Sequence, residues 1–349
     1  MSGPHPRAPS EATVSTAERT RQDPETRHVH AARTGDIVRI TLDRYAALNA
    51  LTGPMVRHIR EALDEDEGTV AAVVLDSSNP KAFCAGGDIR AIRANTLAGD
   101  HAESHAFFAE EYALNERIAS FPVPIVSLID GICMGGGMGL SIHGAARIVT
   151  AKAVLAMPET AIGFFPDVGS SYFLSRLPGA LGQYWGLTGA RISPGDAVYS
   201  GLGTHYIDAI SAADLVAALA TRGSASVEDA LGSLAQSRPE SEAERHRERV
   251  DRVFGAPGVD EILRLLAAED SEWARNAAAL LDAASPQSLR ITHELLAVGA
   301  TQPLRACLDA ELALADVVTR SHDFIEGVRA ALVDKDRNPS WSDEGIRAM

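Results

Sequence analysis

Two glycine-rich turns, Gly86-Gly87 and Gly135-Gly136-Gly137, constrain this chain more than any other feature. Each follows an apolar, β-branched run and precedes a helical pattern. Because glycine has no Cβ, a backbone N–H in such a turn can approach a ligand without obstruction. Either turn alone is more typical of a tight chain reversal. As a pair, they could hold one oxygen that gains negative charge, which predicts an oxyanion hole and acyl chemistry.

Neither turn has the spacing of a phosphate-binding P-loop, and the Gly-x-Gly-x-x-Gly fingerprint is incomplete. A dinucleotide site is therefore only a weak alternative.

Strand and helix patterns alternate along the first part of the chain, which predicts an α/β fold with crossover connections. Short apolar or alternating runs predict strands, and apolar residues at helical spacing predict helices. The predicted strands are 38–42, 70–75, 125–129 and 147–155, and the predicted helices are 52–63, 106–118 and 140–145.

From about residue 210 the strand signals disappear. Helix-period patterns recur in 212–221, 241–254, 258–283 and 303–333. We therefore expect three parts: a disordered extension (1–34), an α/β core (35–210) and a helical C-terminal region (211–349). The pattern leaves open whether the helical region is a separate domain or wraps the core.

The charge balance excludes one class of partner. The formal net charge is −15, and non-specific nucleic-acid binding needs a basic face. No apolar run is long enough for a membrane span. Cys84, Cys133 and Cys307 have no metal-ligand spacing and predict buried thiols in a reducing compartment, so we expect a cytoplasmic protein. A transit peptide is a minor alternative, because the first residues include Glu11 and Glu18.

Two acids follow the last predicted strand. Glu159 and Asp167 lie in a segment with Met157, Phe164 and Phe165. A carboxylate among apolar neighbours is costly unless it is paired or functional, and its pKa tends upward. A helix N-cap for Glu159 and a turn aspartate for Asp167 remain open. The two acids together favour acid–base or nucleophilic work.

Other polar residues favour structural roles by pattern alone. Glu110 and Glu111 are typical of a solvated helix face, His143 of a buried core histidine and Asp88 of a helix cap. Ser141 lacks a nucleophile-elbow motif, so no serine-hydrolase triad is predicted.

Several motifs in combination resemble the crotonase (enoyl-CoA hydratase/isomerase) superfamily, and within it the branch that hydrolyses acyl-CoA thioesters. The resemblance covers nearly everything from about residue 35 onward. It is carried by Leu48–Leu51, Phe83–Ile89, Glu110-Glu111-Tyr112, Gly131–Gly139, Met157–Gly169, Asp323–Arg329 and Asp334-Lys335-Asp336 with Pro339 and Trp341.

The resemblance implies a core of ββα repeats with a helical C-terminal region. It assigns the oxyanion-hole N–H groups to Gly87 and Gly136 and the reactive acid to Glu159. Hydratases of the family place a second glutamate where this chain has Gly139, so the usual two-carboxylate hydration is not expected. The hydrolase branch has a later aspartate, which here is Asp167.

The activity that the resemblance implies is hydrolysis of the thioester of (S)-3-hydroxyisobutyryl-CoA in valine catabolism. The coenzyme A would be part of the substrate, with no metal or other cofactor. Glu111 would bind the 3-hydroxyl group, and Lys81 and Lys335 the phosphates. The family also suggests a homo-oligomer, such as a trimer or hexamer. A hydratase or isomerase on another acyl-CoA, and a catalytically silent acyl-CoA-binding protein, remain alternatives.

Overall fold

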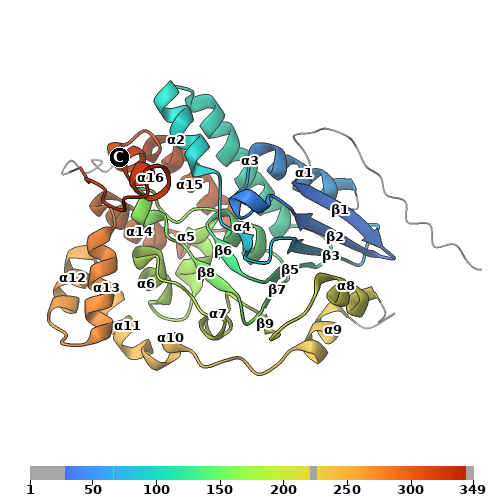
Figure 1. Ribbon diagram of the computed structural model, residues 1–349. Coiled ribbons are helices and arrows are strands. Elements are labelled where there is room, and N and C mark those ends of the chain that lie inside the picture. The colour runs from blue at the N-terminus through green and yellow to red at the C-terminus, as the bar shows by residue number, and fades with distance from the viewer. Residues whose placement is uncertain (1–27, 66, 221–225, 343–349) are drawn as a thin grey trace, which may run out of the picture.

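The computed structural model describes residues 28–65, 67–220 and 226–342, which form two sheets surrounded by helices (Figure 1). The larger sheet has the strand order β1-β2-β3-β5-β7-β9 and the smaller sheet the order β4-β6-β8. The strands are β1 (Val29–Thr34), β2 (Ile37–Leu42), β3 (Ala72–Ser77), β4 (Ala82–Cys84), β5 (Ile125–Ile129), β6 (Ile132–Met134), β7 (Ala146–Val149), β8 (Val154–Ala156) and β9 (His205–Tyr206).

A repeated strand pair builds both sheets. In β3/β4, β5/β6 and β7/β8, the first strand joins the larger sheet and the second joins the smaller one. All pairings between these repeats are parallel. Helices follow β4 and β6: α2 (Ile89–Ala98) with α3 (His101–Ala119), and then α4 (Gly136–Ile142). The expected α/β core of ββα repeats is confirmed.

The larger sheet is buried on both faces, as continuous apolar strands require. Along β3, Val73 and Leu75 join the main core, whereas Val74 joins a second cluster on the opposite face. That second face is covered by α8 (Ala212–Ala220) and α9 (Val227–Leu234), which lie beside β9 in Figure 1.

The remaining helices cover the main core and close around the smaller sheet. They are α1 (Gly53–Glu65), α5 (Ser170–Phe173), α6 (Leu181–Thr188), α7 (Pro194–Ser200), α10 (Glu242–Arg245), α11 (Arg247–Phe254), α12 (Val259–Ala267), α13 (Glu272–Ala283), α14 (Pro286–Gly299), α15 (Leu304–Val318) and α16 (His322–Val328), with short turns η2 (Tyr45–Ala47), η3 (Glu159–Ile162), η4 (Leu174–Arg176) and η5 (Arg329–Val333).

The helical C-terminal region shares its core with the α/β part. One continuous apolar cluster runs from Val38 on β2 to Val328 on α16. Phe164 stacks on Phe108 of α3 at 5.6 Å between ring centroids and contacts Phe324 of α16 at 5.7 Å. Residue 210 thus marks the end of the strands, and the helices beyond it wrap the same core.

Three expectations about elements need correction. The ordered chain begins before Gly35, because Val29–Thr34 form strand β1. The side chains of β1 are mostly exposed and show no apolar alternation, and the strand is held by antiparallel pairing with β2. The predicted strand 147–155 is two strands, one in each sheet. Helix α14 was not predicted from the sequence. The predicted disorder of residues 1–27 lies outside the described residues.

Candidate active site

Three chain segments with predicted functional residues leave the same edge of the smaller sheet. Strand β4 leads to Gly86-Gly87, β6 leads to Gly135-Gly136, and β8 leads to Glu159 at the start of η3. The strands are parallel neighbours, so their carboxyl ends lie side by side. Ligands of α/β proteins bind at this end of parallel strands.

The two glycine turns contact each other directly. A Cβ built on Gly136 would lie 3.3 Å from the amide nitrogen of Gly87, and one built on Gly86 would lie 3.7 Å from that of Gly136. Gly86 has φ +109°, a conformation that favours glycine. The first α4 bond runs from the Gly139 N–H to the Gly135 carbonyl, so the Gly136 N–H precedes the helical ladder. The backbone N–H groups of Gly87 and Gly136 therefore belong to neighbouring turns, as an oxyanion hole would require.

Glu159 lies beside these turns. Its Oε1 is 2.9 Å from the position of a Cβ on Gly135, and its Oε2 has no hydrogen-bond partner among the described residues. The side chain is 7% exposed. Burial, and then the negative charges of Asp167 and Glu111, raise the pKa of Glu159 well above its ordinary value.

Glu111 and Glu110 separate into two roles on α3. Glu110 forms an ion pair with Arg57 at 2.7 Å at the surface, as predicted for a solvated face. Glu111 is 2% exposed, so a solvated face is wrong for it. Its Oε1 has no partner among the described residues, and it would collide with a Cβ on Gly136. Burial, and then Asp167, raise the pKa of Glu111 well above its usual range.

Asp167 completes the carboxylate cluster. Its Oδ2 accepts a 2.7 Å hydrogen bond from the Tyr112 hydroxyl, one residue after Glu111 on α3. Burial raises the pKa of Asp167 to about 7, although the Tyr112 hydrogen bond lowers it. Three mutually close acids cannot all ionise at low cost, so the cluster titrates as a unit.

Strained backbone after Asp167 is held from two sides. Val168 has φ +55°, which is costly for a β-branched residue. Burial lowers the pKa of His143 to about 4, so its ring is neutral and donates Nε2–H to the Val168 carbonyl at 2.8 Å. Glu311 accepts from the N–H groups of Gly169 (2.6 Å) and Ser171 (2.9 Å). These contacts fix the position of Asp167.

Gly139 cannot carry a side chain in this packing. A Cβ there would lie 2.7 Å from the Cβ of Val168 and 2.9 Å from Nδ2 of Asn115. Real Cβ atoms essentially never show contacts below 3.0 Å. There is therefore no space at this position of α4 for the side chain of a second acid.

The predicted phosphate-binding lysines lie away from the cluster. Lys81 is exposed at the end of β4 opposite to the Gly86-Gly87 turn. Lys335 is exposed after η5, in a segment that packs near α2, where the Arg90 side chain bonds the Leu332 carbonyl. The structure brings the predicted glycines and acids close together, but it leaves the two predicted phosphate-binding lysines away from them.

The structure adds residues that the sequence did not single out for this site. Asn115 and Glu311 belong to no recognised motif, and Tyr112 entered only as part of the Glu110-Glu111-Tyr112 motif, without a role. Glu311 had one available signal, because an acid at position 311 lies on the apolar face that Leu308 and Ala315 define on α15.

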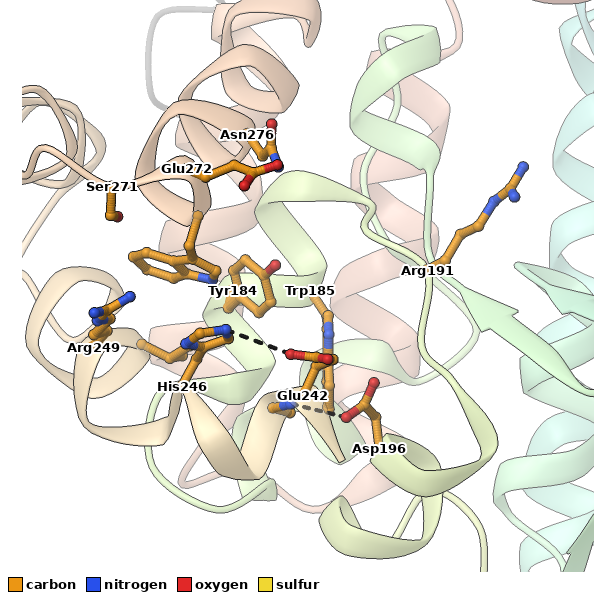
Figure 2. Close-up of a pocket in the computed structure, with 13 residues that line it drawn as sticks. Tyr184, Trp185, Arg191, Asp196, Glu242, His246, Arg249, Ser271, Glu272 and Asn276 are labelled. Carbon is orange, nitrogen blue, oxygen red and sulfur yellow. Dashed lines mark hydrogen bonds and ion pairs between the residues drawn. The ribbon is translucent and has the colours of Figure 1, made fainter. Parts of the chain in front are cut away.

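A separate hollow of about 420 Å³ lies among α6, α10, α11 and α13 (Figure 2). None of the clustered acids lines it. Its polar groups pair with one another: Glu242 with His246 at 3.5 Å, and Asp196 with the Ala243 N–H at 2.9 Å. It is not the site that the glycine turns define.

Among the described residues, no group of three His, Cys, Asp or Glu side chains could hold a metal ion, and no helix has the length and apolar character that crossing a membrane requires. The three cysteines are free and buried, as predicted.

Facing glycine amides beside buried acids, on a ββα-repeat core, define an acyl-CoA enzyme of the crotonase type. The chain belongs to the enoyl-CoA hydratase/isomerase family, whose model matches residues 37–349.

Two similar proteins carry the name of one particular hydrolase. The chain is 42% identical over 86% of its length to 3-hydroxyisobutyryl-CoA hydrolase, mitochondrial, of Danio rerio, covering 81% of that protein. It is 40% identical over 89% of its length to the protein of the same name in Homo sapiens, covering 83% of it.

Two solved structures are similar over most of the chain. An enoyl-CoA hydratase from Rhodobacter sphaeroides 2.4.1 has TM-score 0.84 and 42% identity over 90% of this chain and 92% of its own. A carnitinyl-CoA dehydratase from Mycobacterium thermoresistibile has TM-score 0.85 and 38% identity over 90% and 91%.

Proposed function

We propose that this protein hydrolyses the thioester of (S)-3-hydroxyisobutyryl-CoA to 3-hydroxyisobutyrate and coenzyme A, a step of valine catabolism. The observation that supports the proposal is the direct contact between the Gly86-Gly87 and Gly135-Gly136 turns, with Glu159 beside Gly135 and no room for a second acid at Gly139. Relatives at about 40% identity carry the name of this hydrolase.

The thioester carbonyl oxygen accepts hydrogen bonds from the N–H groups of Gly87 and Gly136. These donors stabilise the negative charge that develops on this oxygen, and one such donor is typically worth about 3 kcal/mol of the barrier. Because the backbone fixes both N–H groups, no reorganisation is needed during the reaction.

Glu159 supplies the reactive carboxylate by one of two routes. It attacks the carbonyl carbon, the C–S bond breaks, and water then hydrolyses the resulting mixed anhydride. Alternatively, it takes a proton from a water that attacks the same carbon. In both routes the sulfur leaves as the thiol of coenzyme A after receiving a proton. When water attacks the acyl carbon, the new carboxylate oxygen of the product comes from water, and when water attacks the glutamyl carbon of the anhydride, that oxygen comes from Glu159.

Asp167 and Glu111 recognise the acyl group and its water. Asp167, held by the Tyr112 hydroxyl, assists the water or positions the substrate hydroxyl. Glu111 offers its unpaired Oε1 to the 3-hydroxyl from the opposite wall. Both carboxyl groups are buried away from water, so the substrate supplies hydrogen bonds that water cannot supply there.

Hydration by two carboxylates is the less favoured reaction, because Gly139 has neither a side chain nor room for one. Two similar solved structures carry hydratase and dehydratase names, so the hydrolase and hydratase activities need a direct comparison.

Several parts of the proposal extend beyond the site. Coenzyme A is part of the substrate, and no metal or other cofactor takes part. Lys81 and Lys335 are the candidates for contacts with the phosphates of coenzyme A. A homo-oligomer, such as a trimer or hexamer, and a cytoplasmic location complete the proposal, although the named relatives are mitochondrial.

The decisive experiment measures free-thiol release from short 3-hydroxyacyl-CoA esters, with crotonyl-CoA hydration assayed beside it. We expect thiol release and little hydration. Glu159→Gln should lower kcat/KM by about 10²–10⁴-fold. The surface variant Glu110→Gln is the matched control and should keep full activity.

Faster hydration than hydrolysis would replace the proposal with the hydratase alternative. Binding of acyl-CoA esters in calorimetry without any turnover would favour a silent binding protein. Full hydrolysis by Glu159→Gln would remove the mechanism.

A further inference from the structure

Asn115 carries a buried amide without a partner. Its side chain is 0% exposed, and neither Oδ1 nor Nδ2 makes a hydrogen bond to a described residue. Buried polar atoms are rarely unpaired, because burial removes their hydrogen bonds to water. The protein therefore gives up stability at Asn115, which points to a use for the amide.

Asn115 lies on the wall of the active site. It follows Glu111 by one turn of α3, so the two side chains share a helix face. Its Nδ2 is 2.9 Å from the position of a Cβ on Gly139, a position that the side chain of Val168 also borders. Val168 directly follows Asp167. The amide thus lies on the same helix face as Glu111, and it borders the same point as the residue that follows Asp167.

A carboxamide matches a hydroxyl group in hydrogen-bonding capacity. It offers one acceptor and two donor positions, and a hydroxyl is both donor and acceptor. The thioester oxygen has its own donors in Gly87 and Gly136, so the amide is available for the rest of the acyl group. Burial raises the pKa of Glu111 and so favours its protonated form, in which Glu111 and Asn115 could share one hydroxyl without a buried charge.

We propose that Asn115 is a specificity-determining residue that hydrogen-bonds the hydroxyl of the acyl group, together with Glu111. This inference rests on the proposed hydrolase function. A site built to bond a hydroxyl rejects an analogue that lacks it, because the buried polar groups then stay unpaired. The amide thus selects hydroxyacyl esters over plain acyl esters.

The test compares two esters, 3-hydroxyisobutyryl-CoA and isobutyryl-CoA, which lacks the hydroxyl. The wild-type protein should strongly prefer the hydroxy ester. Asn115→Leu has nearly the same size and no polar atom. It should reduce the preference, measured as the ratio of the two kcat/KM values, by about 100-fold or more. Hydrolysis of isobutyryl-CoA should stay unchanged or rise.

Ser104→Ala is the matched control. Ser104 is also buried on α3 with an unpaired hydroxyl, but it is eleven residues, or about 16 Å along the helix, from Asn115. It should leave the preference ratio unchanged. Asn115→Ser repeats the test should the leucine variant fail to fold, and it should give an intermediate ratio.

Equal losses for both esters would overturn the inference, because they would mean that Asn115 orders the attacking water or the helix packing. An unchanged ratio would also overturn it. A wild-type protein that releases no thiol from either ester would instead reject the proposed function itself.

Discussion

At the scale of single residues, burial controls the chemistry of this site. Glu159, Glu111 and Asp167 all have raised pKa values because the fold removes them from water and places them near one another. Catalysis needs at least one ionised carboxylate, so activity should increase with pH across the range in which the cluster loses its first protons.

Tyr112→Phe should move the acid limb of the pH profile of kcat/KM to higher pH. The Tyr112 hydroxyl favours the ionised form of Asp167, and burial raises the pKa of Asp167 to about 7 despite this hydrogen bond. Without this donor the pKa rises further, so less of the protein is active at pH 7, and the rates converge at high pH. Tyr172→Phe is the control, because Tyr172 stacks on Arg176 outside the cluster. An acid limb that stays in place or moves lower would contradict this role.

Glu311→Gln should destabilise the protein. Both carboxylate oxygens accept from N–H groups, of Gly169 and Ser171, and an amide NH₂ would face one of these donors. One lost buried bond costs about 1–3 kcal/mol of unfolding free energy. Denaturant unfolding measures this loss, and kcat should fall with it as the Asp167 loop loosens.

Asp316→Asn tests the same helix at its surface. Asp316 pairs with His105 at 2.9 Å but is exposed, so the change should cost less than about 1 kcal/mol. Equal stability of the Glu311→Gln variant and the wild-type protein would show that Glu311 does not hold the loop.

At the scale of elements, three parallel strands of the smaller sheet bring the site together. Each of β4, β6 and β8 ends in a tight turn, and the turns meet at one edge. Helix α3 supplies the opposite wall with Glu111, Tyr112 and Asn115. The strained loop at Val168 packs against α4 where Gly139 allows it.

Gly139→Ala should destabilise the protein despite the better helix propensity of alanine. Propensity alone favours alanine by about 1 kcal/mol, but the new Cβ would lie 2.7 Å from the Cβ of Val168. Overpacking of this kind costs about 1–3 kcal/mol. Val168→Gly should remove this close contact in the double variant, because glycine makes room and accepts φ +55°. The loss of stability that remains should come from the missing side chain of Val168, which is fully buried.

Gly232→Ala on α9 is the control, because nothing lies within 4 Å of its added Cβ. It should stabilise the protein by about 0.5–1 kcal/mol. Thermal or denaturant unfolding of the three variants measures these differences. A Gly139→Ala variant as stable as the Gly232→Ala variant would mean that α4 and the loop can separate freely.

At the scale of the whole molecule, the strands and the C-terminal helices share one apolar core. Phe164 contacts both α3 and α16, and Glu311 reaches from α15 to the catalytic loop. Helices far along the chain therefore position residues of the site.

Thermal unfolding followed by circular dichroism and calorimetry should show one transition. The physical reason is the continuous core that runs from β2 to α16, which neither part can keep without the other. Residues 35–210 expressed alone should fail to fold, because they would expose the surface that α14, α15 and α16 cover. Two separate transitions, or a folded 35–210 fragment, would support independent domains instead.

Local signals in the sequence predicted the glycine turns, Glu159 and Asp167. A glycine cluster after an apolar run, or a carboxylate among apolar neighbours, can be recognised from adjacent residues alone. Most strand and helix positions followed from apolar periodicity for the same reason. Strand β1 did not, because exposed side chains leave no pattern when backbone pairing holds a strand.

Contacts between distant segments required the tertiary structure. Glu111 and Glu110 are neighbours of the same type, and only the rotation of α3 against the glycine turns decides which one is buried. Asn115 lies beside Gly139, and Glu311 accepts hydrogen bonds from the loop that follows Asp167. These partners are far away in the sequence, so only the tertiary structure shows what Asn115 and Glu311 contact. The sequence by itself determined which ionisable and hydrogen-bonding groups this protein has. Tertiary packing decided which of these groups are buried and lie close together. Burial then raises the pKa values of the three clustered acids and so controls their reactivity.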